Sequence, residues 1–213
     1  LEAVDLLEEV GVDAYKIPSG EVTNLPLLAH IAKTGKPVLL SSGMSDWAEL
    51  DAAVEALAPG GPVTVLQCTS AYPCPPERVG LNVIGEMQAR WKLPVGYSDH
   101  ADGFAAAFAA AALGATVIEK HFTFSRLMYG SDAANAMEPG DFTRYCEGLR
   151  EIWRMRASPV RKDDLDPYRE MKRIFEKSVV AARAVAAGTT LTADMLAYKK
   201  PGDGISAARY REI

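Results

Sequence analysis

The sequence predicts an α/β fold in which parallel strands are joined by crossover helices. Apolar, β-branched runs alternate along the chain with amphipathic stretches of helical period. The expected strands begin at intervals of roughly 22 to 32 residues, the length that a strand, a crossover helix and two loops require. The strand runs are apolar at both odd and even positions, which is typical of strands covered on both faces.

The individual elements follow from this alternation. We expect strands at residues 13–18, 37–41, 62–68, 93–98 and 115–122. Helices are expected between them at residues 25–35, 47–61, 80–91 and 102–114. Glycines mark the helix ends at Gly35, Gly60, Gly61 and Gly114, and Asp102 is the expected N-cap of the last helix.

The pattern changes after the fifth expected strand. A loop at 125–138 leads to an expected helix at 141–155, and a charged stretch follows. We expect three parts: residues 1–158, a linker helix at 159–177, and the beginning of a second domain at 178–213, too short to bury a core of its own. Because the chain starts at Leu1 in a helical pattern, we expect it to be a piece of a longer protein.

Composition limits the classes of function. The 213 residues carry a net charge of −5, with 48% hydrophobic and 24% charged residues, as in an ordinary globular protein. The acidic balance argues against general affinity for nucleic acid or anionic membranes. No apolar run reaches the roughly 18 residues of a membrane span, and we expect neither a membrane span nor a signal peptide. The three cysteines do not have zinc-site spacing, so we expect reduced thiols in a cytoplasmic protein.

The strand ends hold most of the residues capable of chemistry. They are Lys16, Ser19 and Glu21; Ser41 and Ser42; Thr69, Ser70 and Tyr72; Ser98, Asp99 and His100; and Glu119, Lys120 and His121. The carboxyl ends of parallel strands are where α/β folds bind ligands. The helix N-termini that follow favour anions, so a phosphate or carboxylate site is expected there.

Two of the three histidines, His100 and His121, end consecutive strands. If the strands are neighbours, they lie about 4.8 Å apart, and the two imidazoles can share one metal ion at about 2.1 Å each. Lys120 has the opposite parity and is expected to point toward the helix layer or the rim. A single histidine at a strand end is more often a structural residue, so both interpretations stay open at this point.

Five motifs, "KIPSGE", "LLSSGM", "QCTSAYP", "GYSDH" and "VIEKHFT", together resemble the sialic acid synthase family in order and spacing. Its members include N-acetylneuraminate, legionaminate and pseudaminate synthases and spore-coat polysaccharide relatives. The tail "SVVAARAVAAGTTLTADMLAYKKPGDGI" resembles the start of the antifreeze-like SAF domain that follows the barrel in this family. The resemblance covers essentially the whole chain.

The resemblance implies a (β/α)8 TIM barrel, of which about five βα units are present here, followed by the start of a SAF domain. It also implies a domain-swapped homodimer. The implied reaction condenses phosphoenolpyruvate with an N-acetylated amino sugar similar to N-acetylmannosamine. The products are a nine-carbon sialic-type acid and phosphate. A divalent metal, Mn²⁺ or Mg²⁺, is implied as cofactor. With three barrel strands absent, two sheet edges are expected to be exposed.

The motifs also imply roles for individual residues. His100 and His121 match the metal ligands; Lys16, Ser19, Ser41 and Ser98, joined by Ser70, match the phosphoenolpyruvate contacts; and Glu21, Tyr72 and Asp132 match residues facing the sugar. Glu119 matches an active-site position. Lys200 stands where an arginine of the swapped domain usually reaches the N-acetyl group, and Ala133 and Ala136 also depart from the family pattern on the sugar side.

Two alternatives stay open, a related enzyme and a protein of a different class. A related 3-deoxy-sugar-acid synthase that uses a phosphorylated aldose needs extra arginines, and the strand ends carry none. A non-catalytic carbohydrate-binding or assembly fragment is the other alternative, because strands of the barrel are absent.

Overall fold

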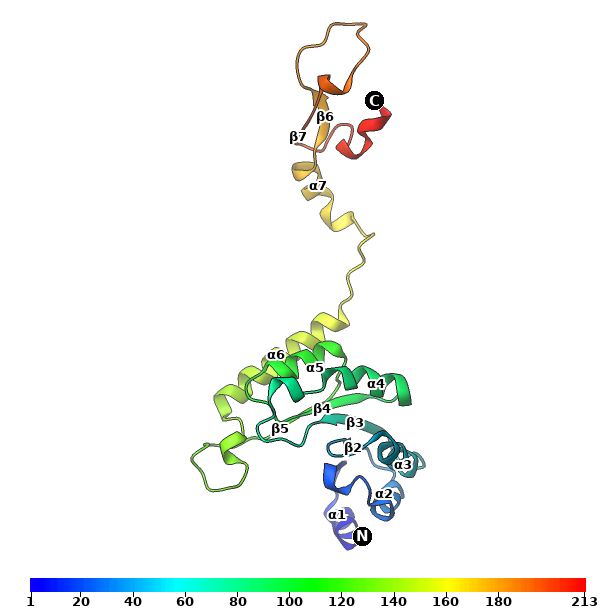
Figure 1. The fold of residues 1–213 in the computed structure, drawn as a ribbon, viewed down its shortest axis with the longest axis vertical. Coiled ribbons are helices and arrows are strands. Elements are labelled where there is room, and N and C mark those ends of the chain that lie inside the picture. Colours follow the sequence, from blue (N-terminus) through cyan, green and yellow to red (C-terminus); the bar gives the residue numbers. More distant parts are fainter. The chain divides into compact units, whose positions relative to one another are not determined.

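The computed structural model describes residues 1–213, which divide into two compact units, Leu1–Ser158 and Pro159–Ile213. The first unit contains one parallel sheet of five strands in the order β1-β2-β3-β4-β5, which is part of a barrel (Figure 1). The strands are β1 Tyr15–Ile17, β2 Val38–Ser41, β3 Val63–Cys68, β4 Val95–Asp99 and β5 Ile118–Lys120. The prediction of a parallel α/β sheet is therefore confirmed.

A helix connects each strand to the next. The helices of this unit are α1 Glu2–Val10, α2 Leu25–Ala32, α3 Trp47–Leu57, α4 Leu81–Trp91, α5 Ala105–Leu113 and α6 Pro139–Ala157. Short 3₁₀ turns span Ser19–Glu21, Pro76–Arg78 and Ala133–Asn135. Figure 1 shows α4, α5 and α6 along one side of the sheet.

The expected N-cap of α5 is wrong. The helix begins at Ala105 with Phe104 in the capping position, and no side chain caps it. Gly103, which has a φ of 72°, turns the chain between Asp102 and the first helical turn, so Asp102 lies outside the helix. At the other end Gly114 takes the left-handed conformation expected of a C-cap, with a φ of 115°.

The two faces of the sheet differ in character. The face toward the helices carries the hydrophobic core, which includes Tyr15, Ile17, Leu40, Val65, Val95 and Tyr97. The opposite face carries polar side chains in register, because Cys68 pairs with Ser98 and Ser98 pairs with Glu119. The alternation of each strand therefore places Lys16, Cys68, Ser98 and Glu119 on the face away from the helices, whereas Asp99 and Lys120 lie on the helix side.

The sheet has two edges with unpaired backbone groups. β1 pairs only with β2, and β5 pairs only with β4. This agrees with the expectation of two exposed edges, a feature that folded proteins normally cover or blunt.

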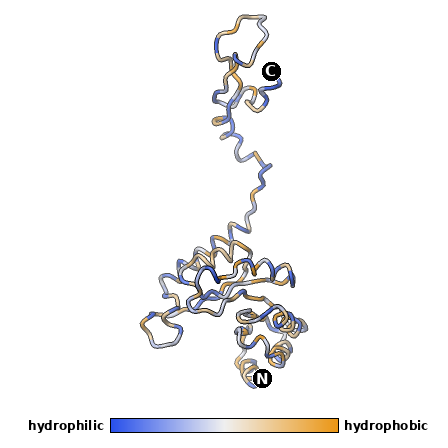
Figure 2. The backbone as a smooth tube through the Cα atoms, viewed as in Figure 1, coloured by the Kyte–Doolittle hydropathy of each residue, from blue (hydrophilic) through white to orange (hydrophobic).

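The second unit is small and contains one antiparallel pair, β6 Ser178–Ala181 and β7 Leu196–Lys199. Its helix α7, Arg169–Phe175, is much shorter than the helix expected at 159–177. Pro159 and Pro167, which lack the backbone N–H of a helix interior, lie before it. Further 3₁₀ turns span Asp166–Tyr168, Ala193–Met195 and Ala207–Glu212. Figure 2 shows that the segment between α6 and α7 is largely hydrophilic.

Membrane crossing by a helix is not a feature of this structure. No helix of the chain combines the length and the apolar character that a bilayer span needs.

Candidate active site

A cavity of about 470 Å³ lies at the carboxyl ends of the five parallel strands. It is lined by Lys16, Pro18, Ser19, Gly20, Ser41, Met44, Cys68, Ser70, Tyr72, Ser98, His100, Glu119 and His121. All predicted site residues except Glu21, Asp132 and Lys200 are in this lining. The roles assigned to them from the sequence stay predictions.

The two histidines face the same cavity. Their ring centroids are 5.6 Å apart, with the planes tilted by 45°. The ring of Tyr72 lies beside both, with its centroid 4.1 Å from that of His100 and 5.7 Å from that of His121. The three rings therefore form one wall of the cavity.

Hydrogen bonding orients the His100 ring. Nδ1 lies 2.8 Å from the carbonyl oxygen of Thr69. Because a carbonyl only accepts, Nδ1 carries the proton and Nε2 keeps its lone pair, which lies 3.5 Å from the Ser98 hydroxyl. A backbone carbonyl on one ring nitrogen is the usual arrangement of a histidine whose other nitrogen binds a metal.

Cys68 adds a sulfur that the sequence analysis did not place in the site. Its Sγ lies 3.8 Å from His100 Nδ1 and 3.8 Å from Ser19 Oγ. Burial raises the pKa of the thiol, but hydrogen bonds with His100, Ser19 and Ser98 outweigh burial and hold this pKa below its usual range. Burial lowers the pKa of His100, but the contacts with Cys68 and Thr69 outweigh it and hold that pKa above its usual range. When a thiol and an imidazole each stabilise the charged form of the other, the pKa of the thiol falls and the pKa of the imidazole rises.

Glu119 carries a buried oxygen without a hydrogen bond. Its Oε2 has no hydrogen-bond partner and lies 3.3 Å from the ammonium of Lys16. The ammonium of Lys16 therefore compensates the charge of this oxygen, which keeps the capacity to accept a hydrogen bond.

The residues present fit a divalent metal ion with open coordination positions. No group of three or more His, Cys, Asp and Glu side chains is placed to hold a metal. His100 and His121 can supply two nitrogen ligands, and the Glu119 carboxylate, which is ion-paired with Lys16, lies in the same cavity. Two protein ligands leave the remaining positions to water and to substrate oxygens, which are the ligands that Mg²⁺ and Mn²⁺ prefer.

Hydroxyl groups converge on the other side of the cavity around Gly43. A Cβ atom at this position would lie 2.6 Å from Ser19 Oγ and would also collide with Ser70 Oγ. The backbone after β2 therefore approaches these two hydroxyls as closely as only glycine allows. Ser41 and Ser98, both buried, also line the cavity, and the Ser98 hydroxyl lies near His100.

Three predicted residues lie outside the lining. The Glu21 carboxylate accepts a hydrogen bond of 2.7 Å from Asn24 Nδ2 in the turn after β1. Asp132 lies in the loop between β5 and α6, and its charge, after burial and the charge of Cys68, helps to raise the pKa of Tyr72. Lys200 belongs to the second unit, where its ammonium lies 4.6 Å from the ring centroid of Phe175.

Lys120 points toward the helices, as its parity predicted. Its side chain is 5% exposed, and its ammonium lies 3.1 Å from the carboxylate of Asp99. Asp99, which the sequence analysis noted without a role, is buried with it. These two charged side chains therefore lie on the helix side of the sheet. In sequence, Asp99 immediately precedes His100 and Lys120 immediately precedes His121.

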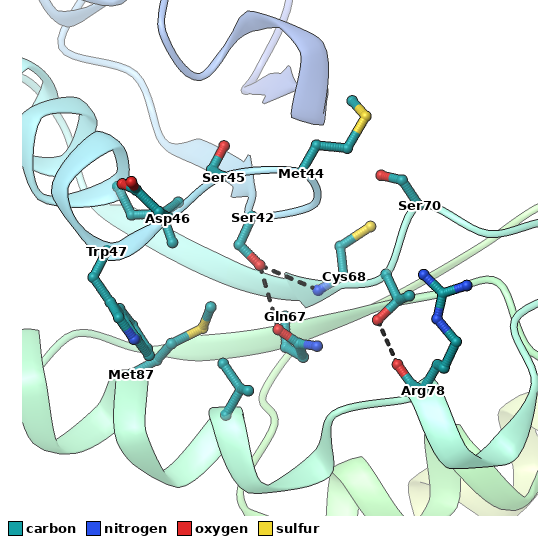
Figure 3. A pocket seen from close by; sticks show the side chains of 13 residues that line it. Ser42, Met44, Ser45, Asp46, Trp47, Gln67, Cys68, Ser70, Arg78 and Met87 are labelled. Carbon is teal, nitrogen blue, oxygen red and sulfur yellow. Dashed lines mark hydrogen bonds between the residues drawn. The ribbon is translucent and has the colours of Figure 1, made fainter.

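A second cavity of about 520 Å³ adjoins the first and shares Met44, Cys68 and Ser70 with it (Figure 3). In Figure 3 the Ser42 hydroxyl accepts a hydrogen bond of 3.2 Å from the backbone N–H of Cys68 and donates one of 3.4 Å to Gln67 Oε1. These bonds give the Ser42 hydroxyl and the Gln67 side chain, both in the lining of the second cavity, hydrogen-bond partners, and they hold the end of β3 in place. Ser42 thus supports the position of Cys68 in the first cavity.

Comparisons with known proteins agree with this geometry. The NeuB family model matches residues 1–161, and the SAF domain model matches residues 176–213. The chain is 40% identical over 217 residues to N,N'-diacetyllegionaminic acid synthase of Campylobacter jejuni, covering 100% of this chain and 65% of that protein. It is 40% identical over 199 residues to N-acetylneuraminate-9-phosphate synthase of Mus musculus, covering 92% of this chain and 55% of that protein.

A solved structure shows the same arrangement. The N-acetylneuraminic acid (sialic acid) synthetase of Leptospira borgpetersenii, determined in complex with citrate, superposes with a TM-score of 0.74 at 29% identity. The match covers 80% of this chain and 60% of that protein. The chain thus spans roughly three fifths of the length of such proteins, with 65% and 55% for the two relatives above.

Proposed function

The chain belongs to the NeuB family, and on this premise we propose that it carries part of the active site of a synthase for a nine-carbon sialic-type acid. The substrates are phosphoenolpyruvate and an N-acetylated amino sugar related to N-acetylmannosamine. The single observation that carries the proposal is the cavity in which one lysine and several serine hydroxyls face a pair of histidines.

The reaction joins carbon 3 of phosphoenolpyruvate to the aldehyde carbon of the open-chain sugar. Water adds to carbon 2, and the bond between carbon 2 and the phosphate oxygen breaks to release phosphate. The pair of electrons for the new carbon–carbon bond comes from the enol double bond. No redox partner is needed.

The residues proposed to bind phosphoenolpyruvate are assigned from the negative charge of this substrate. Lys16 is the one cationic side chain in the cavity lining apart from the histidines, so it is proposed to hold the anionic substrate. Ser19, Ser41, Ser70 and Ser98 are proposed to donate hydrogen bonds to its phosphate and carboxylate oxygens. Fixing this substrate against the sugar lowers the entropic part of the barrier.

His100 and His121 are proposed to hold Mn²⁺ or Mg²⁺. When bound, the ion supplies a Lewis acid for the aldehyde oxygen. The Tyr72 ring shields both imidazoles on one side, and Glu119 offers its unpartnered oxygen to a proton or hydroxyl of the substrates. Glu21 and Asp132 are proposed, from the family resemblance, to orient sugar hydroxyls.

The rest of the proposal concerns the whole protein. We propose that the chain consists of a barrel part at 1–158, a linker at 159–177 and a SAF part at 178–213. We also propose that the protein forms a domain-swapped homodimer. Three free cysteines fit a reducing, cytoplasmic location.

The test is phosphate release from phosphoenolpyruvate in the presence of Mn²⁺ and a panel of N-acetyl hexosamines, unphosphorylated and 6-phosphorylated. Release that depends on one of these sugars supports the proposal. Release only with a phosphorylated aldose that lacks the N-acetyl group would instead indicate the 3-deoxy-sugar-acid synthase. That alternative is disfavoured because no arginine lines the cavity. A protein that binds neither Mn²⁺ nor phosphoenolpyruvate would be a non-catalytic fragment.

Gly43→Ala is expected to raise the KM for phosphoenolpyruvate by roughly tenfold to a hundredfold, because the new methyl group displaces the hydroxyls of Ser19 and Ser70. Steady-state phosphate release at saturating sugar measures this. Gly85→Ala is the matched control, since a Cβ there has no neighbour within 4 Å. An unchanged KM in Gly43→Ala would show that these hydroxyls do not contact this substrate.

Lys200→Arg is expected to lower the KM of the acceptor sugar several-fold and to leave the KM of phosphoenolpyruvate nearly unchanged. A guanidinium offers two parallel donors to an acyl oxygen where an ammonium acts as a point charge. Both constants are measured by initial rates, with Lys199→Arg as the control at the neighbouring position of β7. A shift in the phosphoenolpyruvate constant instead would show that Lys200 is misplaced in this proposal.

A further inference from the structure

A buried cluster lies behind the sheet at the ends of β4 and β5. We call the side chains of Asp99, Lys120 and Tyr145 the buried clamp. Lys120 Nζ lies 3.1 Å from Asp99 Oδ2, and the Tyr145 hydroxyl donates a hydrogen bond of 2.8 Å to the same oxygen. The Asp99 and Tyr145 residues are 1% and 2% exposed. The clamp therefore joins β4, β5 and α6 through side chains that are almost fully buried.

The clamp touches the backbone on both sides of His100. The residue before it, Asp99, is one member of the clamp. The residue after it, Ala101, donates its N–H to Asp99 Oδ1 at 2.9 Å, and its carbonyl oxygen accepts a hydrogen bond from Lys120 Nζ. Lys120 is in turn the immediate neighbour of His121. One ammonium thus binds both flanks of the first histidine and adjoins the second.

Strand register reinforces this connection. Asp99 and Lys120 are direct partners in the pairing of β4 with β5. A shift of one residue between these strands would separate the two charges in a buried place, which is costly. The ion pair therefore specifies the register that brings the imidazoles to ring centroids 5.6 Å apart.

We propose that the buried clamp is a positioning device that fixes how His100 and His121 face a shared divalent cation. This inference rests on the proposed function for its cation. Its geometric part, the fixed orientation of the two rings, concerns this chain alone.

Three variants test the clamp in the intact protein. Lys120→Met leaves the Asp99 carboxylate buried without its cation. The double variant Asp99→Asn with Lys120→Met removes both charges and keeps similar volume, so it guards against simple failure to fold. Tyr145→Phe removes one hydrogen bond and nothing else. Circular dichroism establishes that each variant is folded before binding is measured.

The control is Lys36→Met. Lys36 lies just before β2, at the end of the sheet away from the histidines, and its ammonium lies 2.7 Å from Glu8, which also accepts a hydrogen bond from Tyr15. This variant loses a lysine–carboxylate pair that is partly exposed, at 26% and 35%, and that makes no contact with β4 or β5.

Two readouts separate the inference from the proposed function. Calorimetry with Mn²⁺ alone is expected to show affinity weakened roughly 10- to 100-fold in the double variant, a smaller loss in Tyr145→Phe and no change in Lys36→Met. Imidazole ¹⁵N spectra of the metal-free protein, recorded at a pH at which His100 is neutral, are expected to show this ring as a single Nδ1-protonated tautomer in wild type and as a mixture in the clamp variants. His30, bound to Asp5 at 2.6 Å, is the internal reference.

The outcomes are distinct. Folded clamp variants with wild-type Mn²⁺ affinity and wild-type spectra would overturn the inference and leave the proposed function standing. A wild-type protein that binds no Mn²⁺ would overturn the metal site of the proposed function, and the imidazole spectra would still decide whether the clamp orients the rings.

Discussion

His100→Ala is expected to abolish metal-dependent synthesis, with a loss of at least about a thousandfold in kcat/KM. A Lewis acid at a carbonyl is worth several kcal/mol, and each 1.4 kcal/mol is about a factor of ten in rate. Because Nδ1 is bound to the Thr69 carbonyl, Nε2 is the nitrogen left to bind the metal, and the substitution removes this ligand with the ring. The measurement is phosphate release as a function of added Mn²⁺ in the whole protein.

The comparison with other histidine variants makes this prediction sharp. His121→Ala is expected to behave like His100→Ala, and the double variant is expected to be little worse, because residues that act as one unit are not additive. His30→Ala is the control, since this residue lies in α2 and its ring binds Asp5. A His100→Ala protein that keeps wild-type turnover and its response to Mn²⁺ would contradict the metal assignment.

Much of the fold and of the site could be predicted because a strand has a period of two. Ser98 and His100 share a parity, as do Glu119 and His121, and the structure places all four at one cavity. The opposite direction of Lys120 followed from the same rule. The parallel order of the strands followed from the helices between them, since parallel neighbours require a crossover.

Strand register and local turns could not be predicted. Cys68 has the parity of the cavity face, but only its pairing with Ser98 brings the sulfur beside His100. In the turn after β1, the Glu21 carboxylate accepts a hydrogen bond from Asn24, three residues further along. This contact depends on the backbone angles of the turn, which a sequence motif does not specify. The buried clamp likewise required the register, because Asp99 and Lys120 are 21 residues apart in sequence and meet only across β4 and β5.

The Lys16 ammonium leads to the second large prediction, which separates binding from folding. Its ion pair with Glu119 has both side chains partly exposed, at 31% and 37%, so the pair contributes little to stability. Lys16→Met is therefore expected to fold normally. Its effect should fall on phosphoenolpyruvate, which loses a charge-assisted hydrogen bond worth about 1.5–3 kcal/mol, or roughly 10- to 150-fold in KM.

The measurement is the KM for phosphoenolpyruvate at saturating sugar and Mn²⁺, together with direct binding of phosphoenolpyruvate. Lys36→Met again provides the control, because its ammonium pairs with Glu8 in the same way but lines no part of the cavity. A weaker dependence of binding on salt is also expected in Lys16→Met, since one cation facing the anion is gone. If Lys16→Met changed the acceptor KM and left that of phosphoenolpyruvate intact, the cavity would hold the two substrates in the reverse order. Lys16 and Glu119 would then have to contact the sugar instead.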